Sequence, residues 1–327
     1  MKERQLGIFV FSYNRSKFLD NCLQSLWDCA SGFSIFLVDD NSDDKETQQV
    51  IAKWSEKINR IDPDDKCNKV KDYKVGGLYK NMMRAFVYAR DRNIKYALFI
   101  QDDMQMVRQI EDFDLYFIDS FFENNPQTCE LHTGFLKKSN YQFEEVSSQI
   151  EASKTAYFRD EKTCRGTNIC TGFSAVGVFQ VERFFHFFGR LIDDQQLNEQ
   201  ANERLARSKG IKLGFYAFPF MMWLPMPISS RGKKRSITHK IVEWIGGAGF
   251  HPYNYMSSEE VKKFFHRDLD IKPYAENFLQ SPSVDHLDVW AFAGGIMTVS
   301  VHGGWRKKIG NFINRLSVSR RLARFLR

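Results

Sequence analysis

The chain has 327 residues, of which 43% are hydrophobic and 15% aromatic, so it can bury the sizeable core of one large domain or two unequal ones. The composition fits a globular protein, and no window has the roughly 18 uninterrupted apolar residues of a membrane-spanning helix. The net charge of +7 is unevenly spread, because no acidic residue follows Asp288 and eight Lys or Arg residues follow Trp305.

The N-terminus and the cysteines predict a cytoplasmic protein. Met1–Gln5 is charged and the apolar run behind it is short, which is not typical of a signal peptide. The six cysteines, at positions 22, 29, 67, 129, 164 and 170, are scattered and include no C-x-x-C pair. This pattern indicates reduced thiols rather than disulfides or a zinc site.

The first third of the chain alternates between apolar strands and amphipathic helices. Strands are predicted at 6–13, 34–38 and 96–100, and helices from residue 16, over 46–58 and after Gly76-Gly77. Because each strand is apolar on both faces, the alternation favours a parallel sheet that is covered by helices on both sides.

The second half has weaker patterns. Residues 138–163 are polar and predict a loop, while 166–181 are rich in small residues and predict strands with bends. Residues 182–210 have a helical pattern, and 211–218 resemble a strand. No internal repeat or low-complexity tract is present.

Polar clusters follow the three apolar strands of the first third. They are Ser12-Tyr13-Asn14-Arg15, Asp39-Asp40-Asn41 and Asp102-Asp103. In parallel sheets ligands bind beyond the carboxyl ends of the strands, so these clusters are expected to converge on one site. Adjacent carboxylates suit Mg²⁺ or Mn²⁺, which commonly join one or two carboxylates to a substrate diphosphate. A solvated loop with two acids is the alternative for such a pair taken alone.

Four motifs together resemble the family 2 glycosyltransferases of the GT-A fold. They are "FVFSYNR", "IFLVDDNSDD", "GGLYKNMMRAF" and "ALFIQDDMQ", in the family's order and spacing. The resemblance covers residues 5–107 well and 166–215 weakly. It implies a Rossmann-like, mostly parallel sheet flanked by helices, with a C-terminal helical extension. The expected division is a catalytic domain over 1–225 (a nucleotide-sugar-binding half over 1–107, an acceptor half over 108–225), an extension over 226–302 and a basic amphipathic tail over 303–327.

The resemblance assigns roles to residues of the first half. The residues expected to bind the nucleotide sugar are Ser12, Tyr13, Arg15, Asp39, Lys80, Asn81 and Asp102. Asp39 would accept a hydrogen bond from the base, which favours a base with an N–H edge such as uracil. Asp103 would hold the metal, Mn²⁺ or Mg²⁺. Two departures from the family pattern are Phe11 in place of Pro and Gln101-Asp102-Asp103 in place of Asp-x-Asp.

The resemblance also assigns a general base in the second half. In "NEQANERLARSKGIKLGFY" (198–216), Asn198 falls on the family's Glu and Glu199 on its catalytic Asp. A base is needed because a sugar hydroxyl attacks the anomeric carbon poorly until it loses its proton. The implied mechanism is a single displacement with inversion. The alternative is that Glu199 is an ordinary surface acid, since Asp193 and Asp194 also lie near the helix start.

Two features toward the C-terminus have open interpretations. His239 and His251 lie where some GT-A enzymes supply another metal ligand, although a lone histidine is more often structural. The tail places Trp305, Phe312 and Leu316 on one helical face among Lys and Arg residues. A basic amphipathic helix can lie on an anionic membrane, and a helix docked on the body is the alternative. The positive charge of the tail alone would also suit nucleic acid, but the sequence has no nucleic-acid-binding motif to support that function.

The sequence therefore predicts a cytoplasmic, metal-dependent, inverting hexosyltransferase. It would move a sugar from a nucleoside-diphosphate donor, expected to be a UDP-sugar, to a saccharide or lipid-linked saccharide acceptor in polysaccharide biosynthesis. The basic tail would allow peripheral contact with the inner membrane face. One rival is a nucleotidyltransferase, which would carry a Gly-x-Gly-Thr-Arg loop where this chain has "SYNRSK". The other rival is a non-catalytic sugar- or partner-binding protein that keeps the fold.

Overall fold

A computed structural model describes most of the chain. The residues described are 5–61, 77–136, 148–150, 155–159, 171–194, 198–224, 250–282, 290–293 and 296–299. The tail over 303–327, His239 and much of the expected extension lie outside these ranges.

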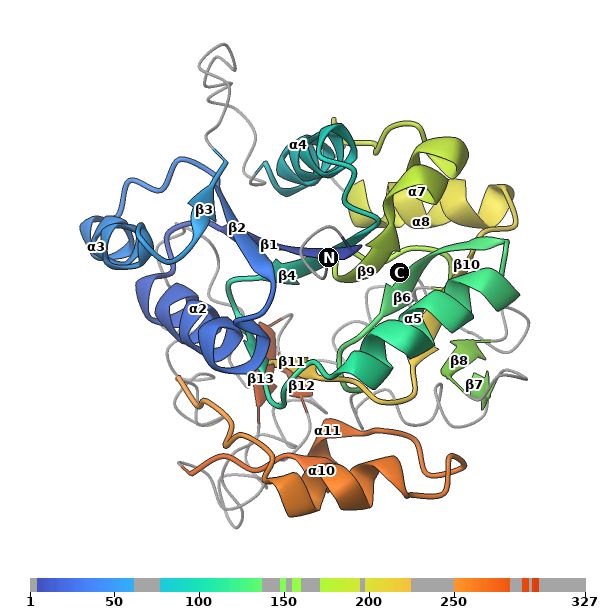
Figure 1. Cartoon of the computed structure of the whole chain (residues 1–327). Helices are drawn as coiled ribbons and strands as arrows, with labels where there is room; N and C mark the ends of the chain where they lie inside the picture. The colour runs from blue at the N-terminus through green and yellow to red at the C-terminus, as the bar shows by residue number, and fades with distance from the viewer. Residues whose placement is uncertain are drawn as a thin grey trace, which may run out of the picture.

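The core of the fold is a nine-stranded sheet with the order β3-β2-β1-β4-β9-β6-β10-β8-β7 (Figure 1). Its first half consists of four neighbouring parallel strands: β3 (Asn59–Arg60), β2 (Ser34–Asp39), β1 (Leu6–Ser12) and β4 (Tyr96–Gln101). β1 is buried along its whole length, as expected for a strand that is covered on both faces. The three apolar strands that the sequence predicts are confirmed.

The second half of the sheet mixes directions. β9 (Gly177–Gln180) is antiparallel to both β4 and β6 (Thr128–His132), and β10 (Lys212–Tyr216) is parallel to β6. β8 (Ala156–Arg159) and β7 (Ser148–Ile150) complete this side through antiparallel pairs. Within this sheet β9 and β8 run against the other strands, so the expectation of a mostly parallel sheet is confirmed.

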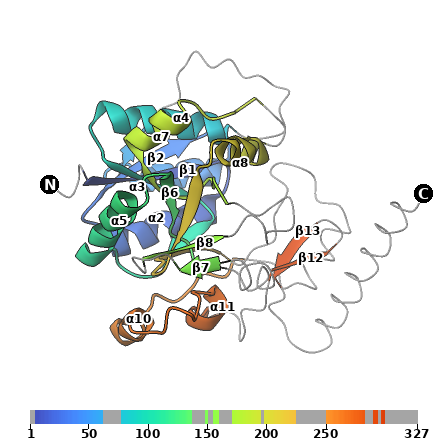
Figure 2. The same cartoon turned by 90° about the vertical axis from the view of Figure 1, so that its right-hand side faces the viewer.

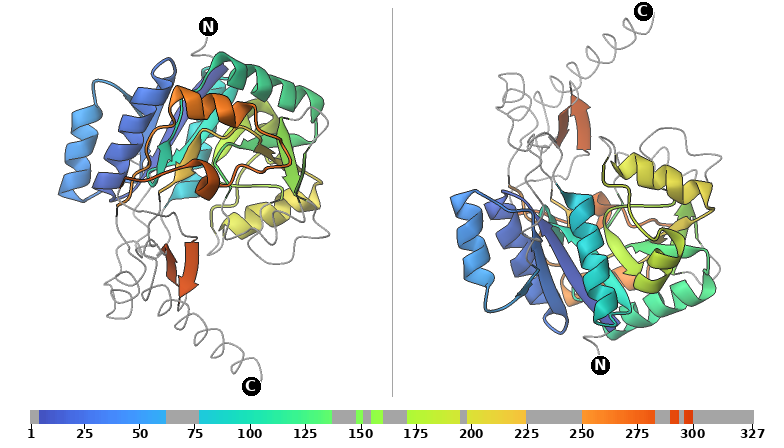
Figure 3. Two further views of the ribbon diagram at one scale, coloured as in Figure 1. Left: turned by 90° about the horizontal axis from the view of Figure 1, so that it is seen from below. Right: turned by 90° about the horizontal axis from the view of Figure 1, so that it is seen from above.

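Helices cover both faces of the sheet. One face is covered by α4 (Leu78–Asp91), α7 (Val181–Phe187) and α8 (Asn198–Ser208), which lie above the sheet in Figure 1. The opposite face is covered by α2 (Ser16–Ala30), α3 (Lys45–Trp54) and α5 (Asp112–Asn124), whose buried residues form a second hydrophobic core with the sheet. The two views of Figure 3 show these groups from opposite sides. Aromatic rings fill the core between the sheet and helices α4 and α7, where Phe86 stacks on Phe184 with ring centroids 3.5 Å apart.

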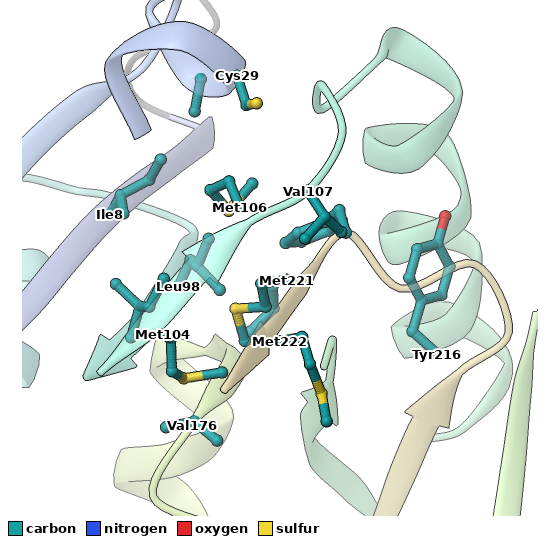
Figure 4. Packing of buried hydrophobic residues seen from close by; sticks show 14 of the residues in the cluster. Ile8, Cys29, Leu98, Met104, Met106, Val107, Val176, Tyr216, Met221 and Met222 are labelled. Carbon is teal, nitrogen blue, oxygen red and sulfur yellow. The ribbon is translucent and has the colours of Figure 1, made fainter. Parts of the chain in front are cut away.

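A small second sheet joins the two halves of the chain. β5 (Met104–Met106) pairs antiparallel with β11 (Met221–Trp223), and their methionines pack in the shared core (Figure 4). α10 (Ser258–Phe265) and α11 (Ala275–Phe278) lie below the main sheet in Figure 2 and contribute Phe264 and Ala275 to the same core. The described part of the extension also includes a hairpin, β12 (Trp290–Ala293) with β13 (Ile296–Val299), so it is not wholly helical.

The structure corrects two expectations in the second half. The polar stretch 138–163 contains strands β7 and β8, because main-chain pairing with β10 forms a strand there whatever the polarity of the sequence. The helical pattern over 182–210 is two helices rather than one. The first ends near Phe187, and Gly189 follows with φ +66°, a left-handed conformation that interrupts the helix.

Candidate active site

The ends of the parallel strands meet at a cleft, as the sequence predicts. Ser12 stands opposite Asp39 in the register, and Phe11 stands opposite Gln101. The backbone then continues the pairing, because the Asp102 N–H donates to Phe11 O at 3.0 Å. The open cleft has an empty volume of about 390 Å³ and is lined by Phe11, Ser12, Tyr13, Arg15, Asp40, Leu78, Asn81, Gln101 and Asp102.

Arg15 and Asp102 are tied together at one side of the cleft. The Arg15 Nη1 donates to Asp102 Oδ1 at 3.2 Å and to Asp103 Oδ2 at 2.6 Å, and the Tyr13 N–H donates to Asp102 Oδ2 at 3.1 Å. Burial by itself lowers the pKa of the Arg15 guanidinium, but the two carboxylates outweigh burial and raise it. Arg15 is therefore a fixed positive charge that offsets one of the two negative charges of the carboxylate pair.

Two polar atoms at this place lack a hydrogen-bond partner among the described residues. They are Asp103 Oδ1 and Ser12 Oγ, and both atoms are buried. Buried polar groups are normally paired, so unpaired ones at a strand-end cleft suit a ligand. Asp103 itself is not among the residues that line the cleft, and its other oxygen already accepts from Arg15.

The residues present fit a hard divalent cation to a limited extent. Asp103 Oδ1 is a carboxylate oxygen, the ligand type that Mg²⁺ and Mn²⁺ prefer, and such ions usually keep waters and take further oxygens from a substrate phosphate. The described residues include no group of three or more His, Cys, Asp or Glu side chains that could hold a metal by themselves. The site therefore fits a metal that binds together with a diphosphate.

At the end of β2, Asp39 makes hydrogen bonds that the sequence did not reveal. Asp39 is buried, and its two oxygens accept from Ser42, from Oγ at 2.6 Å and from N at 2.8 Å. Ser42 Oγ accepts in turn from the Asn14 N–H at 2.9 Å, where Asn14 has φ +50°. Asp39 thus joins the turns that follow β1 and β2, while its neighbour Asp40 lines the cleft.

Asp40 fixes the start of α4. Its Oδ2 accepts from the Gly77 N–H at 2.7 Å, and its Oδ1 accepts from Asn81 Nδ2 at 2.9 Å. A Cβ at Gly77 would lie 2.6 Å from Asp40 Oδ1, so only glycine allows this close approach. Of the predicted pair on α4, Asn81 is buried and lines the cleft, whereas Lys80 is exposed and does not.

The acceptor half places a buried carboxylate where the sequence did not predict one. Glu203 on α8 accepts from the backbone N–H groups of Thr171, Gly172 and Phe173 at 2.7–3.1 Å. It also accepts from the Thr171 hydroxyl at 2.9 Å. Glu203 therefore holds a stretch of backbone, and Glu199, one turn earlier on the helix, is exposed.

Glu130 on β6 continues this arrangement. Its Oε2 accepts from the Ser174 N–H at 2.9 Å, and its Oε1 is buried without a partner among the described residues. Burial raises the pKa of Glu130 well above its usual value, and the charges of Glu203 and Glu199 raise it further, while the Ser174 bond lowers it. Glu130 and Glu203 together bind four consecutive backbone N–H groups, a pattern that no local sequence signal reveals.

The segment held by these carboxylates leads back to the cleft. Gly177, at the start of β9, stands opposite Phe99 near the end of β4, so residues 171–176 precede β9 at the strand end that carries Asp102 and Asp103. Figure 4 shows Val176 close to Met104, and both belong to one buried cluster.

Comparisons with known proteins agree with the motifs. Residues 7–112 match the family model of glycosyl transferase family 2. The resemblance to the family 2 glycosyltransferases is confirmed. The match supports sugar transfer in general and spans the parallel strands and the carboxylates that form the cleft.

Similar solved structures are distant in sequence. The crystal structure of residues 1–349 of S. aureus TarS in complex with UDP is 14% identical, with a TM-score of 0.44, over 67% of this chain and 60% of that chain. A mannosyltransferase from Pyrobaculum calidifontis in complex with GDP-Man and Mn²⁺ is 10% identical, with a TM-score of 0.41, over 82% and 67%. This chain thus spans less than two thirds of that TarS structure. The comparison with curated proteins gives no match.

Two further observations concern cysteines and membranes. Cys22, Cys29 and Cys129 are free and buried, which agrees with the predicted reduced state for these three residues. Across the described ranges, no helix is both long and apolar enough to span a bilayer.

Proposed function

We propose that the protein is a metal-assisted, inverting hexosyltransferase that takes its sugar from a nucleoside-diphosphate sugar, namely a UDP-sugar. The observation that carries this proposal is the cleft at the strand ends. There, the Arg15 guanidinium and the Tyr13 N–H hold the adjacent carboxylates of Asp102 and Asp103, and Ser12 Oγ and Asp103 Oδ1 are buried without a partner among the described residues. Such a collection of donors and acceptors suits a phosphorylated, hydroxylated ligand.

The donor nucleotide would occupy the cleft between β1, β2 and α4. Ser12, Tyr13, Asn81 and Asp102 line it, and Asp102 would face the ribose. Asp39 would lie near the base of the nucleotide, where its carboxylate also accepts from Ser42 Oγ. Lys80, which is exposed on α4, would contact the phosphates.

Asp103 would hold Mn²⁺ or Mg²⁺ through its unpaired oxygen. The metal, when bound, would supply positive charge to the leaving diphosphate. Arg15 adds charge from the protein itself, since its guanidinium is already fixed beside Asp103 and needs little reorganisation to interact with a phosphate.

Glu199 would take the proton from the acceptor hydroxyl. An exposed carboxylate at the start of α8 can reach an acceptor that enters from solvent, whereas Glu203 is fully engaged with backbone N–H groups. Attack from the face opposite the leaving group gives inversion at the anomeric carbon.

The proposal is tested by measuring nucleoside-diphosphate release from a panel of UDP- and GDP-sugars with Mn²⁺, Mg²⁺ or EDTA. Metal-dependent release of UDP from one or more UDP-sugars supports it. Pyrophosphate release from nucleoside triphosphates would instead indicate a nucleotidyltransferase. Absence of both turnover and metal-dependent nucleotide binding would indicate a binding protein that keeps the fold.

We also propose that the acceptor is a saccharide or a lipid-linked saccharide of polysaccharide assembly, and that the enzyme works in the cytoplasm at the inner membrane face. This rests on the basic, amphipathic composition of residues 303–327. Co-sedimentation with anionic and neutral vesicles, for the full chain and for a chain ending at residue 302, tests it. Binding that is equal for both chains would contradict it.

A further inference from the structure

We infer that Trp223 is a stacking platform for the acceptor saccharide. This inference rests on the proposed function, because it names the substrate class of the same site. Trp223 ends β11 and is partly exposed, whereas Met221, Met222 and Leu224 beside it are buried. A tryptophan that remains partly exposed within a buried run is a candidate for contact with a ligand.

Trp223 lies directly beside the residue proposed to hold the metal. It pairs with Met104 in the β5–β11 sheet, and the N–H of Leu224 donates to the carbonyl oxygen of Asp103 at 2.9 Å. Its own carbonyl accepts from the Tyr253 hydroxyl at 3.0 Å, so the backbone is fixed on both sides. The backbone of Trp223 is therefore held next to the backbone of Asp103.

The position of Trp223 separates it from the nucleotide. The cleft lies on the side of β1, β2 and α4, whereas the Trp223 ring contacts His132 on β6, which is on the other side of β4 and β9 in the sheet. Asp103, at the end of β4, stands between the two. An acceptor must approach the anomeric carbon from the side away from the nucleotide, and Trp223 is on that side.

The ring is also held in one orientation. It meets the His132 ring edge to face, with centroids 5.4 Å apart and planes at 87°. The Gly134 N–H donates to His132 Nδ1 at 3.1 Å, which leaves the ring proton on Nε2. A Cβ at Gly134 would lie 2.8 Å from His132 Cε1, so glycine lets the His132 ring pack against the backbone there, and the same Cβ would meet Trp223 Cζ3 at an ordinary contact distance of 3.4 Å.

A rigid aromatic face suits a pyranose ring. The C–H bonds on one face of a sugar carry partial positive charge and pack on the negative face of an aromatic ring. The hydroxyl groups at the rim of the sugar remain available for hydrogen bonds. The ligand class is therefore a hexopyranoside that presents one unbroken C–H face, positioned with its hydroxyl toward the anomeric carbon of the donor.

The test compares Trp223→Ala and Trp223→Phe with Trp27→Ala, an exposed tryptophan on α2. The measurement is UDP release from the active UDP-sugar, with methyl glycosides of glucose, galactose, mannose and N-acetylglucosamine as acceptor probes. We expect Trp223→Ala to raise the KM for the glycoside about tenfold or more, Trp223→Phe to retain most of the affinity, and Trp27→Ala to match the wild type. The KM for the donor and the release of UDP without acceptor should remain unchanged.

The outcomes separate this inference from the proposed function. Equal glycoside KM values for Trp223→Ala and wild type overturn the inference and leave sugar transfer intact, as does a wild type that hydrolyses donor but responds to no glycoside. Loss of Mn²⁺-dependent UDP binding in Trp223→Ala, measured by calorimetry, would show a structural role and also overturn it. A wild type that shows no such binding overturns the proposed function itself.

Discussion

The guanidinium of Arg15 lies 2.6 Å from Asp103 Oδ2 and leaves Asp103 Oδ1 buried without a partner among the described residues. One oxygen of Asp103 thus accepts from Arg15, and the other would be available to a cation. This division means that Arg15 both stabilises the site without metal and competes with metal for negative charge.

Replacing Arg15 should therefore have opposite effects on stability and metal binding. We expect Arg15→Ala to lower the free energy of unfolding by about 3 kcal/mol without metal, because two largely buried carboxylates lose their counterion. Mn²⁺ should raise the Tm of the variant more than that of the wild type. Thermal unfolding with and without Mn²⁺ measures both effects.

Lys53→Ala is the matched control for Arg15→Ala. It breaks an exposed ion pair with Asp20 and should cost less than about 1 kcal/mol, with no change in the response to Mn²⁺. If Mn²⁺ raises the Tm of Arg15→Ala no more than that of wild type, the proposal that Arg15 competes with the metal is wrong.

The two glutamates on α8 should separate chemistry from structure. Glu199→Gln is expected to abolish transfer with little change in Tm, because Glu199 is exposed and is the proposed base. Glu203→Ala is expected to lower the free energy of unfolding by about 3 kcal/mol or more, because three backbone N–H groups lose their acceptor in a buried place. Chemical denaturation and initial rates give the two readouts. A fully active Glu199→Gln would show that another group is the base.

Glu130 should make stability depend on pH. Its folded pKa is raised, mainly by burial, so its contribution is fully present below the unfolded pKa and is lost as pH rises through the folded pKa. We expect Glu130→Gln to match wild type near pH 4 and to be more stable at pH 8, because the amide keeps an acceptor for Ser174 and never ionises. Glu130→Leu, which loses that acceptor, should be destabilised at both pH values. Parallel Tm profiles for wild type and Glu130→Gln would contradict this account.

Gly77 should be intolerant of a side chain because of Asp40. Gly77→Ala puts a Cβ within 2.6 Å of Asp40 Oδ1, which must move and release Asn81. We expect the Kd for the nucleotide, measured by calorimetry, to rise about tenfold. This change corresponds to about 1.4 kcal/mol of binding free energy. Gly32→Ala is the control, since nothing lies within 4 Å of its added Cβ. Equal losses in both variants would indicate a general effect on folding.

The first half of the fold and most of the cleft could be predicted from the sequence because their signals are local. Each parallel strand is a continuous apolar run with its polar residues directly after it, so the convergence of Ser12, Asp40 and Asp102 follows from sheet geometry alone. The sequence could not show that Asp39 is engaged by Ser42, since neighbouring acids in one turn look alike until the backbone is placed.

The second half could not be predicted to the same extent because its contacts are distant in sequence. Glu203 holds backbone around residues 171–173, and Glu130 holds Ser174 from another strand. Neither interaction has a side-chain partner that a motif could reveal. β8 forms by main-chain pairing with β10, and the position of Trp223 beside Asp103 depends on the β5–β11 pair.

The most direct test of the account is the binding of UDP to wild type, Asp103→Asn and Asp43→Asn by calorimetry, with Mn²⁺ and with EDTA. We expect Mn²⁺ to tighten UDP binding by wild type and by the exposed control Asp43→Asn, and to have no effect on a folded Asp103→Asn, since the negative charge of the carboxylate proposed to hold the metal is lost. The same Mn²⁺ enhancement in Asp103→Asn as in wild type would contradict the account.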